Sequence, residues 1–188
     1  NLNLNIFTYR IFNIIELFIE INLKRLVLGR GNIFSRIVII GEAPGANEDI
    51  KGKPFVGKSG TFLNRLLTLS GINLKDIYFC NVIKCRPPNN RKPSKEEVDA
   101  HKPWLLQQIK LIDPEIIILS GSTAMKAILD INQPISDIRG KWIKKNKRDY
   151  ITIFHPSYLM RFSTKDSTNP YGLTLNDPIN VRKKLYDL

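Results

Sequence analysis

Cysteine and histidine are scarce in this chain of 188 residues, which has two of each. Two cysteines, Cys80 and Cys85, cannot build a disulfide scaffold, and a reducing compartment inside the cell is the default for such a protein. Acidic residues are also few, since 17 Asp and Glu stand against 29 Lys and Arg, a formal charge of +12. This excess favours a polyanionic partner, nucleic acid first and an anionic membrane surface second, although a compositional bias towards Lys explains it equally well.

Long apolar runs are absent as well. The N-terminal stretch to Leu23 is rich in Leu, Ile and Phe, but polar residues interrupt it before about 18 apolar residues accumulate, as a transmembrane helix requires. It lacks a basic start and a small-residue cleavage site, which argues against a secretory signal. Residues 10–22 show the spacing of an amphipathic helix, so we expect residues 1–30 to form a helical segment packed on the rest of the protein.

The remaining composition is that of a globular protein. Hydrophobic residues make up 43% and charged residues 24%, which excludes a wholly disordered or fibrous chain and suits one domain over residues 1–188. Short β-branched runs alternate with segments of helical periodicity, and this alternation predicts an α/β fold with a mostly parallel sheet covered on both faces. We expect strands at 36–41, 77–82, 115–119, 141–143 and 150–154, and helices at 59–70, 94–112, 122–130 and 178–185.

Three polar loops leave the carboxyl ends of the predicted strands, the edge at which parallel sheets bind ligands. The first loop, Gly41 to Gly57, has neither the glycine spacing of a dinucleotide-binding loop nor that of a P-loop. Its small residues let a ligand approach the backbone, and its carboxylates can orient or deprotonate a water molecule. Taken alone, Glu42 and Glu48 are more often solvated loop charges, and Phe55 is more often a core residue than a stacking platform.

The second loop begins at Asn81, the end of a predicted strand. Its amide offers a donor and an acceptor in one plane and can match the edge of a pyrimidine, although an isolated Asn at this position is usually a turn former. Four basic side chains surround Asn81 and can contact phosphates, namely those of Lys84, Arg86, Arg91 and Lys92.

The third loop begins at His155. An isolated histidine is most often a hydrogen-bonded structural residue. The run Leu159, Met160 and Arg161 combines apolar and basic side chains. It suits either a wedge that enters a base stack or the first turn of an amphipathic helix.

Four segments occur together in order: Gly-Glu-Ala-Pro-Gly from residue 41, Pro-Phe-Val-Gly from 54, Asn-Val-Ile-Lys-Cys-Arg-Pro-Pro from 81 and His-Pro-Ser-Tyr-Leu-Met-Arg from 155. Their order and spacing closely resemble the family 4 uracil-DNA glycosylases, the iron–sulfur branch of that superfamily. The resemblance runs from about Arg36 to Arg161. It implies a three-layer α/β/α sandwich with a central four-stranded sheet, and hydrolysis of the bond that joins uracil to deoxyribose in DNA.

The resemblance implies a pocket for a flipped-out uracil. Phe55 would stack on the base, a contact worth about 1–3 kcal/mol, and Asn81 would read its hydrogen-bonding edge. Cytosine presents the opposite pattern and would leave buried groups unpaired. Glu48 would crowd the position of a thymine methyl group, and the small residues Gly41, Ala43 and Gly45 complete the expected substrate-binding set.

The resemblance also implies catalytic and DNA-binding residues. Glu42, with backbone groups of the loop around it, would hold the attacking water. His155 would hydrogen-bond uracil O2 as negative charge develops on the leaving base. The residues expected to contact DNA are Lys58, Ser59, Arg86, Ser157, Leu159, Met160 and Arg161, of which the last three would fill or brace the gap left by flipping.

The sequence departs from the family at the iron–sulfur site. Family members usually bind a [4Fe–4S] cluster through four cysteines, whereas Ile14, Leu17, Cys85 and His101 stand at those positions here. One thiolate and one imidazole cannot hold four irons, so we expect no cluster and no other cofactor, with packing of the N-terminal helix in its place. Two ligands without a third also argue against a zinc site at Cys85 and His101.

The leading hypothesis is a monofunctional uracil-DNA glycosylase that leaves an abasic site. No lysine is clearly placed for Schiff-base chemistry, and the Lys84–Pro87 loop lacks the histidine that a related branch bonds to the sugar. A DNA-binding relative with little catalysis, a glycosylase for another altered base, and an enzyme of RNA or free nucleotides remain alternatives. We expect a monomer that binds single- or double-stranded uracil-containing DNA, away from membranes, in the cytoplasm at the nucleoid.

Overall fold

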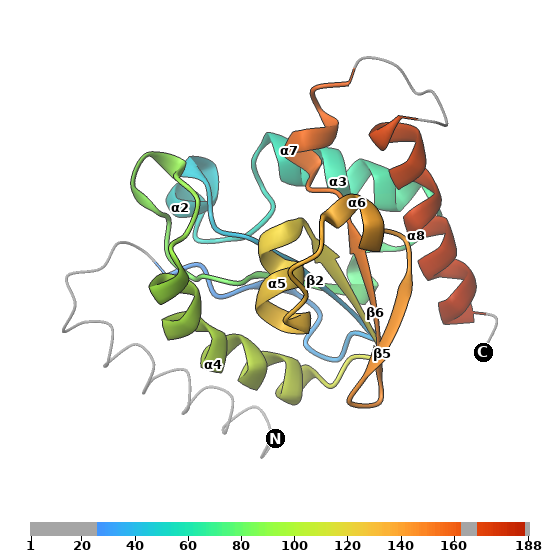
Figure 1. Cartoon of the computed structure of the whole chain (residues 1–188), viewed down its shortest axis with the longest axis horizontal. Helices are drawn as coiled ribbons and strands as arrows, with labels where there is room; N and C mark the ends of the chain where they lie inside the picture. Colours follow the sequence, from blue (N-terminus) through green and yellow to red (C-terminus); the bar gives the residue numbers. More distant parts are fainter. Residues whose placement is uncertain (1–25, 163–168, 187–188) are drawn as a thin grey trace.

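The computed structural model describes residues 26–162 and 169–186 (Figure 1). The strands in these ranges are β1 (Arg30–Gly31), β2 (Ile37–Gly41), β3 (Ile77–Asn81), β4 (Ile116–Ser120), β5 (Trp142–Lys145) and β6 (Arg148–Ile153). The helices are α2 (Ala46–Lys51), α3 (Lys58–Leu69), α4 (Lys95–Ile112), α5 (Ser122–Leu129), α6 (Ile135–Ile138), α7 (Pro156–Leu159) and α8 (Pro170–Tyr186), with 3-10 turns η1 (Leu74–Asp76) and η2 (Pro88–Asn90). Strands and helices alternate along most of the chain, which confirms the predicted α/β class.

The strands form one six-stranded sheet in the order β1-β3-β2-β4-β6-β5. The four central strands are parallel, and β1 and β5 pair antiparallel at the two edges. The prediction of four strands therefore holds for the parallel centre and is wrong for the total. β1 has only two residues, too few for a periodic pattern. β5 overlaps the expected strand at 141–143 and joins the sheet as an antiparallel edge, because a tight basic turn rather than a crossover helix leads from it to β6.

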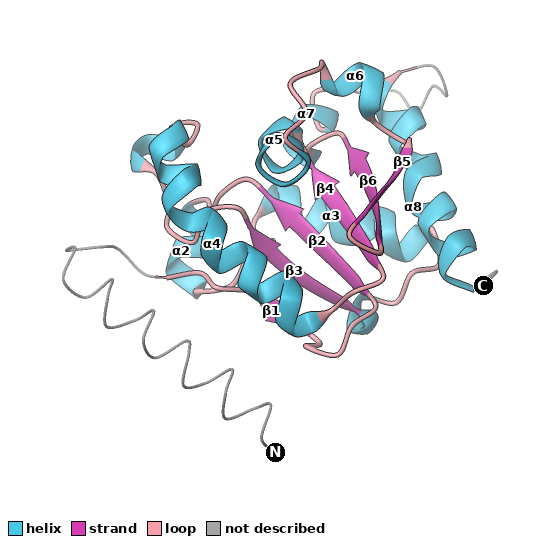
Figure 2. Cartoon of the chain, turned by 60° about the horizontal axis from the view of Figure 1, so that its bottom comes forward, coloured by secondary structure: helices cyan, strands magenta, loops and turns pink. Residues whose placement is uncertain are grey.

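Side chains that alternate along the strands build one core on each face of the sheet. Val38 and Ile40 of β2 point to the face covered by α4 and α5. Ile37 and Ile39 of the same strand point to the face covered by α3 and α8. Figure 2 shows the resulting three layers, with the sheet between the two helix pairs. All five residues of each central strand from β2 to β4 are buried, as expected for a parallel sheet between helices.

Two predicted helices differ from the structure or lie outside it. The last helix begins at Pro170 rather than at Pro178. A proline favours a helix start, but Pro178 lies inside α8, where burial of Val181 and Leu185 outweighs the lost backbone hydrogen bond. The predicted N-terminal helix at 10–22 lies outside the described residues. None of the described helices is long and apolar enough to cross a membrane.

Candidate functional site

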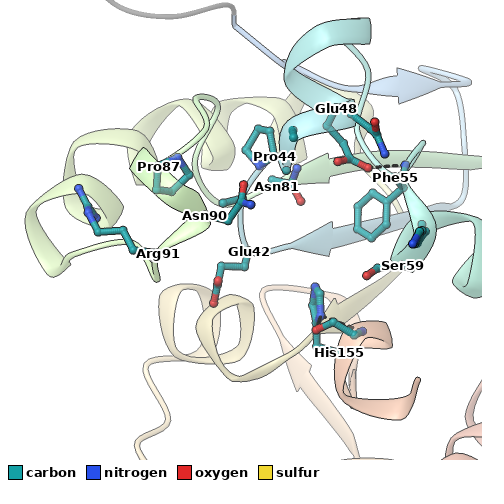
Figure 3. Close-up of a pocket in the computed structure, with 18 residues that line it drawn as sticks. Glu42, Pro44, Glu48, Phe55, Ser59, Asn81, Pro87, Asn90, Arg91 and His155 are labelled. Carbon is teal, nitrogen blue, oxygen red and sulfur yellow. Dashed lines mark hydrogen bonds between the residues drawn. The ribbon is translucent and has the colours of Figure 1, made fainter. Parts of the chain in front are cut away.

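A cavity of about 490 Å³ lies at the carboxyl ends of three of the four parallel strands, β2, β3 and β6 (Figure 3). Its lining residues come from the last residue of β3 and from the segments that follow β2, β3 and β6. Ten of the predicted site residues line this cavity: Glu42, Ala43, Gly45, Glu48, Phe55, Lys58, Ser59, Asn81, His155 and Ser157. The sheet thus brings together side chains that lie more than 100 positions apart in the sequence.

The other predicted residues lie around the cavity rather than on its wall. Gly41 is buried beneath it, at the end of β2. Arg86 is not among the lining residues, but its Nε donates to Oδ1 of Asn90, which lines the cavity, at 2.8 Å. Met160 and Arg161 are exposed beyond α7, but Leu159 has no exposed surface and packs in a small core cluster with Leu66 and Phe154. Leu159 is therefore a core residue here, and only Met160 and Arg161 of that run are exposed on the surface.

Phe55 and Asn81 meet over Gly41. A Cβ atom on Gly41 would lie 2.5 Å from Asn81 Oδ1 and 2.7 Å from Phe55 Cζ, so only glycine lets both side chains approach this point. Phe55 is 8% exposed and its ring lies against Phe79, with the ring centroids 5.6 Å apart. An aromatic face and a planar amide thus share one corner of the cavity (Figure 3).

The backbone at Phe55 is in the left-handed region, with a φ of 56°. Such a φ costs a residue with a Cβ on the order of 1 kcal/mol, so contacts elsewhere stabilise it. Glu48 is one of them, because its Oε1 accepts from the amides of Val56 at 3.0 Å and Gly57 at 2.6 Å. Gly60 of α3 lies so close to the Phe55 main chain that a Cβ there would be 2.2 Å from its carbonyl carbon.

Glu42 follows β2, and its carboxylate is held by a residue that follows β4, a strand end outside the three predicted loops. The Thr123 hydroxyl, in the first turn of α5, donates to Glu42 Oε2. The N-terminus of α5 carries partial positive charge, which favours a carboxylate beside it. Thr123 could have been noticed from Gly121, because a glycine directly after the β4 segment marks another turn at the same sheet edge.

His155 follows β6 and caps the short helix α7. Its Nδ1 accepts from the backbone amide of Ser157 at 3.2 Å and lies 2.7 Å from Ser157 Oγ. An Nδ1 that accepts an amide hydrogen places the imidazole proton on Nε2, which is then a donor. Burial lowers the pKa of His155, and the nearby Glu42 opposes that shift only in part. The histidine is thus a neutral donor at neutral pH.

Lys84 lies behind Asn81 and is 2% exposed, so the prediction of a phosphate contact is wrong for this residue. Its Nζ donates to the main-chain oxygen of Asn81 at 2.7 Å and to Gln108 Oε1 at 2.5 Å. Burial lowers the pKa of Lys84. The Lys84 side chain thus fixes the main chain at the end of β3, where Asn81 begins the second loop.

The residues at the positions of the family's cluster ligands do not suit a four-iron cluster. Burial raises the pKa of Cys85, and Asp49 raises it further. His101 Nδ1 lies 2.8 Å from the main-chain oxygen of Glu97. Cys80 is fully buried in the core. Across the described residues, no three His, Cys, Asp or Glu side chains are grouped to hold a metal ion. Ile14 and Leu17 lie outside those residues.

Comparison with known proteins identifies the family. The model of the Uracil DNA glycosylase superfamily matches residues 28–177. The chain is 46% identical to the type-4 uracil-DNA glycosylase of Thermotoga maritima over 147 residues, and this alignment covers 76% of each protein. It is 38% identical over 146 residues to the type-4 enzyme of Pyrobaculum aerophilum (73% of this chain, 74% of the relative) and 41% identical over 144 residues to that of Archaeoglobus fulgidus (71% of each). The chain therefore belongs to the uracil-DNA glycosylase superfamily and, within it, to the type-4 branch.

Proposed function

We propose that the protein is a monofunctional uracil-DNA glycosylase, which hydrolyses the N-glycosidic bond of deoxyuridine in DNA and leaves an abasic site. One observation carries the proposal: an aromatic ring, a planar amide and a neutral imidazole from three separate loops line a single cavity. Phe55, Asn81 and His155 are the residues concerned (Figure 3). Together they supply a face, an edge and a donor for one pyrimidine, which is what a flipped base requires.

The proposed reaction uses the polar side of the cavity. A water held by Glu42 attacks C1′ of the sugar, and the bond from C1′ to uracil N1 breaks. The electron pair of that bond moves onto the uracil ring, where charge develops on O2. His155 Nε2–H donates a hydrogen bond to O2, and the imidazole remains neutral as it does so. The water releases its proton towards Glu42, which Thr123 holds in place.

Selectivity rests on two side chains. Asn81 is 3% exposed, so a base with the wrong hydrogen-bonding edge leaves its amide unsatisfied. Glu48 would exclude a 5-methyl group, because its carboxylate is fixed to the Val56 and Gly57 amides and cannot easily move aside. Uracil satisfies both conditions, whereas cytosine fails the first and thymine the second.

The DNA strand would cross the rim of the cavity. Lys58 and Ser59 at the start of α3 and Ser157 at the start of α7 offer a cation and hydroxyls for phosphates. Met160 is 46% exposed beside the exposed Arg161 and would brace the gap left by the flipped base. We propose that a monomer performs the reaction on single- or double-stranded DNA, inside the cell where the DNA is.

The activity would not depend on an iron–sulfur cluster. Two cysteines in the whole chain cannot supply the four thiolates of a [4Fe–4S] site, and Cys80 belongs to the core. Visible absorbance of the purified protein tests this point, because a broad iron–sulfur band would contradict it.

The function is tested with oligonucleotides that carry one uracil, single-stranded or paired with adenine or guanine, followed by alkaline cleavage. We expect scission only at the uracil position and only after alkali. Matched oligonucleotides with thymine, cytosine or hypoxanthine should stay intact. Binding without release of uracil would support a non-catalytic relative instead, and cleavage at hypoxanthine alone would indicate another lesion. Affinity for DNA should fall steeply with salt, as expected when several phosphates are contacted.

A further inference from the structure

Arg30 reaches behind the Phe55 loop from the short edge strand β1. Its Nε donates to the carbonyl oxygen of Pro54 at 2.7 Å, and its Nη2 donates to the carbonyl oxygen of Phe55 at 3.2 Å. The same Nη2 also donates to Asn64 Oδ1 of α3, at 3.1 Å. All three acceptors are neutral oxygens. One guanidinium therefore joins the loop that carries Phe55 to the helix that follows it.

The guanidinium also supports the aromatic rings. Arg30 is the register partner of Phe79 across β1 and β3, and its Cζ lies 4.0 Å from the centroid of the Phe79 ring. Phe79 in turn contacts Phe55, with a tilt of 52° between the rings. The three side chains form a continuous stack from the edge of the sheet to the cavity wall.

Opposite charges act on the two ends of one peptide group. The Phe55–Val56 peptide accepts from the Arg30 cation through its carbonyl oxygen and donates to the Glu48 carboxylate through its amide hydrogen. Both contacts favour the same orientation of that peptide. This orientation fixes ψ of Phe55, and the contact from Arg30 to the Pro54 oxygen fixes the preceding peptide, so Arg30 and Glu48 together hold the left-handed backbone at Phe55.

We propose that Arg30 is a positioning residue for the nucleobase platform, a role that rests on the proposed function. Arg30 touches neither the base nor the reacting bond. It fixes the Phe55 ring at the angle at which a flipped pyrimidine stacks, by holding the main chain on both sides of Phe55 and the ring of Phe79 beneath it.

Arginine suits this role and lysine does not. A planar guanidinium donates in two directions while its face lies on an aromatic ring, whereas an ammonium is a point charge. Burial lowers the pKa of Arg30, but a guanidinium remains charged at neutral pH. We therefore expect Arg30→Lys to retain part of the effect and Arg30→Met to lose all of it.

The test measures uracil binding apart from DNA binding. Arg30→Met should raise the inhibition constant of free uracil about 10-fold and lower kcat/KM for uracil-containing DNA by a similar factor, since charged hydrogen bonds position the ring. Arg30→Lys should change both about 3-fold. Affinity for an abasic-site duplex, which contains no base to stack, should stay within about twofold. Arg36→Met is the matched control, because it removes one guanidinium that pairs with Glu115 away from the cavity and should change none of these values.

A double-mutant cycle makes the assignment specific. In a Phe55→Ala background, Arg30→Met should have no further effect on uracil inhibition, because there is no ring left to position. An additive effect in the double variant, or an equal loss of abasic-site affinity, would overturn the proposal. Hydrogen exchange at the Val56 and Gly57 amides should accelerate in Arg30→Met and Arg30→Lys whether or not the protein excises uracil. A parent that excises no uracil defeats the proposed function, whereas unchanged exchange defeats the role of Arg30.

Discussion

The two edges of the parallel sheet use charged and polar residues in different ways. At the amino edge, where β2, β4 and β6 begin, charges neutralise one another: Arg36 pairs with Glu115, Arg148 with Asp113 and Lys184 with Asp149. At the carboxyl edge, Glu42, Asn81 and His155 direct their functional groups into the cavity, and each is held by a neighbour that takes no part in the proposed chemistry.

The difference separates the two edges by role: function depends on the carboxyl edge, and the ion pairs of the amino edge affect only stability, to a small extent. The Arg36 and Glu115 side chains are 47% and 48% exposed, and ion pairs of this kind contribute about 0.2–1 kcal/mol. At the carboxyl edge Asn81 and Phe55 are 3% and 8% exposed, so a small displacement of either side chain alters the contacts to a bound base. We therefore expect changes at the carboxyl edge to alter excision strongly and changes at the amino edge to alter only the free energy of unfolding.

The largest effect is expected at Asn81. Asn81→Ala removes the amide that reads the base, and we expect kcat/KM for uracil excision to fall about 10²–10³-fold. The free energy of unfolding should change little, because the backbone contact from Lys84 to the residue 81 carbonyl does not involve the side chain. Excision from a single-stranded oligonucleotide and a thermal melt measure the two quantities. Excision by Asn81→Ala at the rate of the parent would remove the amide from the site.

Thr123 offers a smaller effect on the same edge. Thr123→Val preserves the shape of the side chain but removes its donor to Glu42 Oε2, so the carboxylate is free to rotate away from the water site. We expect kcat to fall about 10-fold with little change in KM, because Glu42 contacts the water and not the base.

Thr123→Ser is the matched control. Serine keeps the hydroxyl and should restore kcat to within about threefold of the parent. If Thr123→Ser is as slow as Thr123→Val, the loss results from packing at the start of α5 and not from the hydrogen bond.

The sequence predicts the centre of the fold and the main wall of the cavity. The run Ile-Val-Ile-Ile before Gly41 consists of β-branched apolar residues, which is sufficient to identify a buried parallel strand. Once the strands are known, the loops at their carboxyl ends meet at one edge. Glu42, Phe55, Asn81 and His155 therefore line a single cavity, as expected from their positions after the strands.

The supporting contacts are not predictable from local pattern. Thr123 and Glu42 are 81 positions apart and Arg30 and Phe55 are 25 apart, and neither pair shows any periodicity that marks a contact. β1 is too short to be recognised, and the burial of Leu159 depends on how α7 packs on α3. The expectations of one domain over residues 1–188 and of no cofactor stay predictions.

The acidity of His155 gives a prediction about pH. Burial lowers its pKa below the ordinary value of about 6.5, so the imidazole stays largely neutral where a solvent-exposed histidine is half protonated. We expect kcat/KM at pH 6.5 to stay within about twofold of its value at pH 8, because the neutral tautomer with a proton on Nε2 is the donor. NMR titration gives the pKa directly, and the signal that His155→Gln removes identifies the residue. A His155 pKa above 6.5 would contradict this account.

The same shift affects stability, with a defined sign. Because the pKa of His155 is lower in the folded protein than in the unfolded chain, the unfolded chain binds protons first as the pH falls through about 6.5. The protein should therefore lose stability on acidification, and His155→Gln should lose less over the same interval. Burial lowers the pKa of His101 as well, so part of the loss should persist in that variant.

The smallest effect is expected at the amino edge and completes the comparison. Arg36→Met removes a bidentate contact to Glu115, with Nε–Oε1 at 2.6 Å and Nη2–Oε2 at 2.8 Å. Both side chains are about half exposed, so solvent screens the pair, and we expect the free energy of unfolding to fall by about 0.2–1 kcal/mol and less at high salt. The rate of uracil excision should be unchanged. A drop in excision as large as that of Thr123→Val would show that the two edges are coupled through β2, which begins after Arg36 and ends just before Glu42.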